Sequence, residues 1–282
     1  MSLSYFPLEG DDFRFTLGLH ALKGRTWLHE DQHRHADLLE KDRILTKHYD
    51  HVVATHTRTL EAQQEILELV CTERQNTFPD TASQVPSQSS EIPIVTAARQ
   101  VQEDLVLMQE SDNGYILTAA CVCFPTGWNL RENIGKPIMA IHEPVPELNE
   151  RIGGSIDRFF QNLKEGKKVE RFNWGLYDCP DLFQPAWIRD THRSDPRIDF
   201  ENVGQKVFFR VERQTLQRLS KDRGILFTIR IFTNTLADVA SDKNRASRLS
   251  HSLQTMPDSV KEYKSINRFA APLTAFLKAA AI

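Results

Sequence analysis

The chain has 282 residues and a formal net charge of −3 at pH 7, from 35 basic and 38 acidic side chains. A protein that binds nucleic acid through its charge would show a strong basic excess, so this class is excluded. There is no run of about 18 apolar residues and no basic start followed by an apolar stretch, so we expect a cytoplasmic protein with neither a membrane span nor a secretory leader.

The first third of the chain is predicted to be mainly helical. Residues 1–30 mix glycine, proline and aromatic side chains, which indicates an extended segment packed onto the body. Apolar residues recur at helical spacing over 31–50 and again over 51–73, so each is predicted to be a helix. Residues 76–95 are rich in Gln, Ser, Thr and Pro and predict a flexible loop, and 95–109 is expected to form a short helix.

The middle of the chain is predicted to contain a strand followed by a helical insert. Residues 115–124 are almost continuously apolar, which is typical of a central strand. Residues 126–146 are irregular, 147–165 have a helical apolar stripe, and 168–177 resemble a strand.

The last third is predicted to be a hairpin followed by helices. Apolar and polar residues alternate over 206–212 and over 225–232, and 213–224 would form a long connection between these strands. Residues 235–282 are predicted to be largely helical. The expected fold class is α+β, with one antiparallel sheet and flanking amino-terminal and carboxy-terminal helices.

A histidine at the end of the irregular region is the first candidate ligand. The segment reads Ile141-His142-Glu143-Pro144-Val145-Pro146. Two prolines stiffen the backbone and would hold the imidazole in one orientation, as a metal ligand requires. The same pattern fits a loop histidine bonded to backbone, so both interpretations stand on the pattern alone.

Charged residues on the predicted strands suggest a ligand pocket. Alternation places Arg210 and Glu212 on one face of a strand, and Arg230 on one face of the next. If these faces coincide inside a covered sheet, the charges need a partner such as a carboxylate-bearing ligand, and otherwise they form a solvent-facing pair. Arg171 and Trp174 would suit a flat ligand with a carboxylate, or equally a strand with an exposed arginine and a core tryptophan.

The remaining cysteines and histidines do not predict a metal site. Cys121 and Cys123 lie in an apolar run and are expected to be buried core residues. His29 and His33 have i, i+4 spacing but lack the His-Glu-x-x-His arrangement, so a solvated helix surface is the better interpretation.

Taken in chain order, these segments resemble the haem-dependent oxidative N-demethylase alpha subunits and their relatives, over roughly residues 13–277. The matching stretches are Gln102-Glu103-Asp104-Leu105, Cys123-Phe124-Pro125-x-x-Trp128, Gly135-Lys136-Pro137, Ile141-His142-x-Pro144-Val145-Pro146, Arg171-x-Asn173-Trp174, Arg210-x-Glu212-Arg213-Gln214-Thr215-Leu216-x-Arg218-Leu219 and Phe227-Thr228-Ile229-Arg230, with weaker flanks at Trp27-x-x-x-Asp31 and Tyr263-Lys264.

The resemblance implies one haem-binding PAS-like domain over residues 1–282, with helical extensions at 1–75 and 235–282. It implies an oxygenase that uses O₂ and haem b to demethylate a small secondary amine such as dimethylamine. Electrons would come from NADPH through separate flavin and iron–sulfur proteins, because this chain has neither a dinucleotide-binding fingerprint nor a four-cysteine cluster. The long loop and the polar stretch 189–205 could admit a larger substrate.

The resemblance also implies roles for individual residues. His142 would bind the haem iron, with His192 as the alternative ligand. The cofactor-binding residues would be Arg171, Trp174, Arg210 and Arg213, and the catalytic residues would be Asn173, Glu212 and Arg230. Of these, Arg171, Arg210 and Arg230 would pair with haem propionates or polarise bound oxygen, while Glu212 and Asn173 would orient an amine or manage protons.

Two other functions stay open on the sequence. The chain could be a PAS-type sensor that binds haem without turnover, or a protein that kept the fold and binds another apolar ligand. Several charges in one pocket favour the enzyme, because a gas sensor has less need of them.

Overall fold

The computed structural model describes residues 3–8, 10, 12–22, 24–82, 90–189, 197–221 and 223–282. Within them the protein is built on one seven-stranded sheet, in which all neighbouring strands are antiparallel, in the order β1-β5-β6-β7-β3-β4-β2. The strands are β1 His20–Ala21, β2 Val53–Thr55, β3 Asp104–Ser111, β4 Gly114–Cys121, β5 Lys168–Tyr177, β6 Phe208–Arg218 and β7 Ile225–Thr235.

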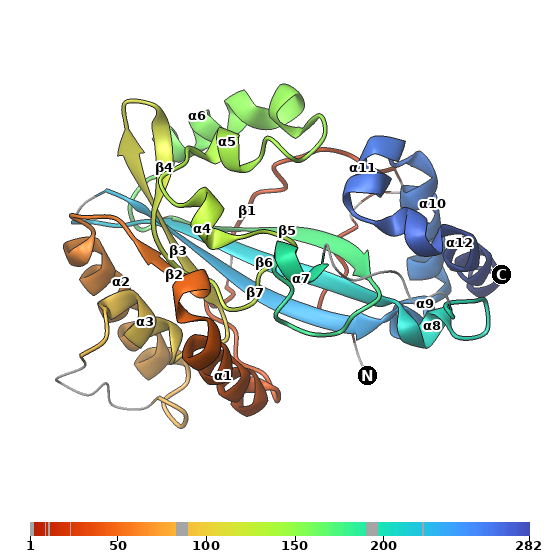
Figure 1. Cartoon of the computed structure of the whole chain (residues 1–282), viewed down its shortest axis with the longest axis horizontal. Helices are drawn as coiled ribbons and strands as arrows, with labels where there is room; N and C mark the ends of the chain where they lie inside the picture. The colour runs from red at the N-terminus through yellow and green to blue at the C-terminus, as the bar shows by residue number, and fades with distance from the viewer. Residues whose placement is uncertain are drawn as a thin grey trace.

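Helices surround this sheet in three groups (Figure 1). Helices α1 to α3 lie together near the short strand β2, α5 and α6 lie together on another side, and α8 to α12 gather near the carboxy terminus. The helices are α1 Arg34–Val52, α2 Leu60–Thr77, α3 Pro93–Ala98, α4 Leu130–Asn133, α5 Ile138–Ile141, the π-helix η1 Asn149–Gly153, α6 Gly154–Asn162, α7 Ala186–Arg189, α8 Val203–Lys206, α9 Leu236–Ala240, α10 Lys243–Thr255, α11 Asp258–Tyr263, the 3₁₀ helix η2 Ile266–Phe269 and α12 Ala270–Ala280. The predicted α+β class is therefore confirmed.

Three apolar cores hold these layers together. One packs α1 to α3 against the sheet and contains the buried thiols of Cys121 and Cys123, as expected. A second packs α8 to α12 on the sheet together with residues near the amino terminus, such as Leu8. The third lies beneath α4 to α6 and includes Ile156 and Phe160 of α6.

The helix predicted over 95–109 is wrong in its second half. Helix α3 ends at Ala98, and Asp104–Ser111 forms strand β3 between β4 and β7. The run is apolar on both faces, a pattern shared by buried helices and central strands, and only pairing with β4 and β7 distinguishes them. The Asp104 carboxylate also accepts the backbone N–H groups of Cys123 and Phe124, which anchors the start of the strand.

Two other boundaries differ from the prediction. The helix expected at 51–73 begins only at Leu60, because Val53–Thr55 pairs with the end of β4. The hairpin strands continue through the predicted connection, since β6 runs to Arg218 and only residues 219–224 join it to β7. Part of the loop predicted at 76–95 lies outside the described residues.

No helix among the described residues is both long and apolar enough to cross a membrane.

Candidate functional site

One face of strands β5 and β6 carries a row of polar side chains. Residues that pair directly in an antiparallel sheet share a face, and alternate residues of one strand share it too. Asn173 pairs with Glu212 and Arg171 pairs with Gln214, so all four lie on one face. We call this the site face.

The carboxylate of Glu212 is fixed by two amides of this row. Its Oε2 atom accepts a hydrogen bond from Nε2 of Gln214 at 2.8 Å and another from Nδ2 of Asn173 at 3.3 Å. The side chain is half-buried, and its Oε1 atom accepts no hydrogen bond from a described residue. Glu212 therefore presents one oriented oxygen toward whatever occupies this face.

His142 lies at the end of α5, close to the same row. Its backbone N–H donates to the carbonyl of Ile138 at 3.1 Å, which closes the short helix. Its Nδ1 atom is buried and has no hydrogen-bond partner. Burial, and secondly the nearby charge of Arg171, lower the pKa of His142 to about 4. The imidazole is therefore neutral at pH 7, the form in which it can bind a metal.

The helix before His142 is apolar yet incompletely covered. Helix α5 consists of Ile138, Met139, Ala140 and Ile141, and none of the four is fully buried. Its position is fixed by Asn149 of η1, whose Nδ2 atom donates to the carbonyl of Met139 at 2.8 Å. Apolar side chains therefore border the neutral imidazole from a helix tied to the next element.

Arg171 also has an unsatisfied donor. Its Nε atom is buried without a partner. Burial lowers the pKa of Arg171, while the charge of Glu212 opposes the shift. A buried N–H of a cation favours an anionic acceptor, and no described residue supplies one at this atom.

Arg210 shares this face by register but serves a different purpose. It is fully buried, and its guanidinium donates to Thr126 Oγ1 and to the carbonyls of Phe124, Asp181 and Leu182, at 2.9 to 3.0 Å. Burial lowers the pKa of Arg210. The donors are used to hold two loops together, so the side chain is not available to a cofactor.

The faces of Glu212 and Arg230, which the sequence left open, do not coincide. Arg213 pairs directly with Arg230, while Glu212 pairs with Ile231. Arg230 therefore lies on the face opposite to Glu212, together with Arg213, and Trp174 of β5 lies there too. The Trp174 ring packs against Phe209, with centroids 5.6 Å apart, in the core beneath the carboxy-terminal helices.

On that opposite face the two arginines are paired with carboxylates. Arg213 donates to Glu170 at 2.8 Å, and Arg230 lies 2.8 Å from Asp31 and 3.2 Å from Asp37. Burial raises the pKa of Asp31, but the charge of Arg230 and the hydrogen bonds from Gln102 and His33 together outweigh it and hold that pKa below its usual value. Arg213 also donates to the carbonyl of Thr26 at 2.6 Å, so both arginines attach the amino-terminal segment to the sheet.

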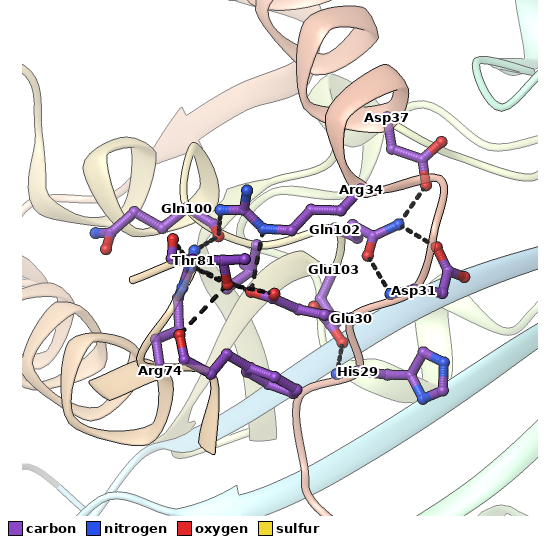
Figure 2. A network of polar contacts seen from close by, with 12 residues as sticks. His29, Glu30, Asp31, Arg34, Asp37, Arg74, Thr81, Gln100, Gln102 and Glu103 are labelled. Atoms are coloured by element: carbon purple, nitrogen blue, oxygen red, sulfur yellow. Dashed lines mark hydrogen bonds and ion pairs between the residues drawn. The ribbon is translucent and has the colours of Figure 1, made fainter. Parts of the chain in front are cut away.

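Figure 2 shows how the motif Gln102-Glu103 extends this attachment. The Gln102 amide donates to Asp31 at 3.0 Å and to Asp37 at 2.6 Å, and Glu103 accepts the backbone N–H of His29 at 2.7 Å. The motif is therefore structural, and it lies away from His142.

Sequence reasoning missed Gln214 as a site residue. It is only 7% exposed, and its Oε1 atom is buried without a partner. Alternation from Glu212 along the same strand would have placed it on the site face. The alternative ligand His192 lies outside the described residues.

The described residues contain no group of three or more His, Cys, Asp or Glu placed to hold a metal ion. The structure thus brings together His142, Arg171, Asn173, Glu212 and Gln214. Arg210 lies on the same face with its donors already used, and Arg213, Trp174 and Arg230 lie on the opposite face.

Comparison with known protein families gives a match over most of the chain. The family model described as HODM_asu-like, haem-dependent oxidative N-demethylase, alpha subunit-like, matches residues 18–274.

Proposed function

The chain belongs to the haem-dependent oxidative N-demethylase alpha subunit-like family, and from that premise we propose that it is the haem-binding component of an oxygenase that demethylates a secondary amine. The observation that carries this proposal is the neutral imidazole of His142, whose buried Nδ1 atom has no partner, beside a row of polar residues.

The residues around His142 fit a haem. A haem iron needs as few as one protein ligand, because the porphyrin supplies four nitrogens, so one histidine outside any cluster is sufficient. The incompletely covered apolar residues of α5 suit a porphyrin face, and the unpaired N–H of Arg171 suits a propionate. His142 would therefore hold the iron and Arg171 a carboxylate at the edge of the ring.

The bound haem would supply the oxidising chemistry: a secondary amine with an N-methyl group, O₂, two electrons and two protons give the demethylated amine, formaldehyde and water. Glu212 would bind the ammonium form of the substrate through its free Oε1 atom and accept its proton. Asn173, which donates to the other oxygen, would keep that carboxylate oriented.

We also propose that this chain is one component of a larger enzyme. The name of the family as an alpha subunit supports a multi-component enzyme. We infer that electrons come from NADPH through a separate flavin and iron–sulfur reductase, and that residues 1–282 form one PAS-like domain. The four free cysteines suit a reducing compartment such as the cytoplasm.

An absorption spectrum of the purified protein after reconstitution with haem tests the proposal. We expect a Soret band that His142→Ala abolishes or shifts and that His35→Ala, a change at an exposed histidine, leaves intact. Absence of the band in the wild-type protein would contradict haem binding, and an unchanged spectrum in His142→Ala would move the ligand to another residue. Formaldehyde release that needs NADPH, reductase and O₂ distinguishes an enzyme from a sensor.

A further inference from the structure

Gln214 is oriented by its neighbour on the same strand. Its amide forms a hydrogen bond of 2.8 Å with Oε2 of Glu212, and that oxygen also accepts from Asn173. Oε2 of Glu212 acts as a hydrogen-bond acceptor, so the Gln214 amide must turn its nitrogen, the donor, toward Glu212. The carbonyl oxygen Oε1 therefore points away from Glu212.

This oxygen has no partner in the protein. It is buried, Gln214 as a whole is 7% exposed, and no described residue donates to it. Arg171 lies directly opposite on β5, but its side chain does not donate to this oxygen. A buried amide oxygen without a donor is uncommon in folded proteins and indicates a missing ligand or water.

The two unsatisfied groups of the site face differ in chemistry. Arg171 offers an N–H that needs an acceptor, whereas Gln214 offers an oxygen that needs a donor. A haem propionate only accepts, so it can satisfy Arg171 but not Gln214. The partner of Gln214 must carry an N–H or O–H group.

We infer that Gln214 is the residue that selects secondary over tertiary amines. Glu212 binds one N–H of a secondary ammonium, and the carbonyl oxygen of Gln214 accepts the second N–H. A secondary ammonium has two N–H groups and matches the two oxygens. A tertiary ammonium has one and leaves the Gln214 oxygen unsatisfied. The inference rests on the proposed amine substrate and adds a discrimination that the family name does not contain.

Binding measurements on the haem-loaded protein test this role. Dimethylammonium and trimethylammonium chloride are titrated calorimetrically into the wild-type protein and into Gln214→Met, which keeps the length of the side chain and removes its polar atoms. Both amines lose the support that Gln214 gives to Glu212, but only dimethylammonium loses a hydrogen bond of its own. We therefore expect the dissociation constant of dimethylammonium to rise about tenfold more than that of trimethylammonium, the scale of one hydrogen bond to a charged group.

Gln217→Met is the matched control. Gln217 lies on the same strand, is also 7% exposed and also has a buried unpartnered amide atom, but it lies on the opposite face. The ratio of the two dissociation constants should therefore stay at its wild-type value in this variant.

An unchanged ratio of the two dissociation constants in Gln214→Met would overturn the inference, because the partner of the carbonyl oxygen would then be water. Equal weakening of both amines would overturn it too, and so would a wild-type protein that binds neither amine. The Soret band and its dependence on His142 are measured on the same samples. A failure of amine discrimination can therefore be distinguished from a failure of haem binding.

Discussion

Single residues of the same type have different roles on this sheet. Arg171 and Arg210 both point from the site face, and burial lowers the pKa of each. Arg210 donates to carbonyls of two loops, whereas Arg171 keeps an unpaired Nε. The difference lies in their surroundings, because the loops around Asp181 approach only Arg210. Residue type and strand position alone therefore do not identify a cofactor-binding arginine.

The pKa of His142 predicts how the stability of the haem-free protein depends on pH. Its folded pKa is about 4, against 6.5 for an unperturbed histidine, so the unfolded chain binds more protons between these values. The free energy of unfolding should fall as the pH drops through this window, by at most about 3 kcal/mol from this group.

Urea unfolding at several pH values between 4 and 7 measures this effect. His142→Gln should flatten the dependence, and His35→Gln, at an exposed histidine, should not. Parallel curves for the wild-type protein and His142→Gln would show that the imidazole is already charged or solvated in the folded protein.

At the scale of elements, α5 depends on the π-helix that follows it. Asn149 binds the carbonyl of Met139, and the methyl end of Met139 occupies the space next to the α-carbon of Gly153. A π-helix is rare and is found mostly at functional sites. Here it positions the helix whose last turn ends at His142.

Gly153→Ala should disturb this arrangement, because the added methyl group would overlap with the end of the Met139 side chain. Because the end of a methionine side chain can shift, we expect the free energy of unfolding to fall by no more than about 1 kcal/mol, and haem affinity to fall with it. Gly154 is the matched control, since a methyl group there meets nothing within 4 Å. Gly154→Ala should be neutral or stabilising by up to about 1 kcal/mol.

Urea unfolding and haem titration of both variants measure the changes in stability and in haem affinity. Equal behaviour of Gly153→Ala and Gly154→Ala would mean that Met139 moves aside without cost and that η1 does not position α5.

At the scale of the whole molecule, the two faces of the sheet have different roles. The site face carries the candidate site residues, and the opposite face binds the amino-terminal segment through Arg213 and Arg230. Trp27 and Leu28 of that segment are buried in the core shared with α1 to α3. The amino-terminal residues are therefore an integral layer of the structure.

Arg230→Met should weaken this layer, because Asp31 and Asp37 would lose their cation near the sheet. We expect a loss of about 3 kcal/mol in the free energy of unfolding. Faster amide hydrogen exchange over residues 26–37 should accompany it, with the Soret band retained.

The control is Arg14→Met, at an exposed arginine 3.8 Å from Asp12, which should change stability by less than about 1 kcal/mol. Loss of the Soret band in a folded Arg230→Met protein would instead connect this arginine to the haem.

The sequence by itself determined the α+β class, the main strands and most helices, because apolar periodicity is a local property. It also placed Glu212 beside Arg210 on one face, since alternation within a strand needs no knowledge of the partner. The ordered motifs gave the family.

Only the tertiary structure decided which residues meet across strands. The register of β6 and β7 pairs even-numbered residues with odd-numbered ones, so Arg210 and Arg230 lie on opposite faces. A shift of one residue would have reversed this, and the register depends on where the strands end and on long-range packing. For the same reason, the strand at 104–111 and the unpartnered oxygen of Gln214 became visible only once β3, β5 and β6 had their neighbours.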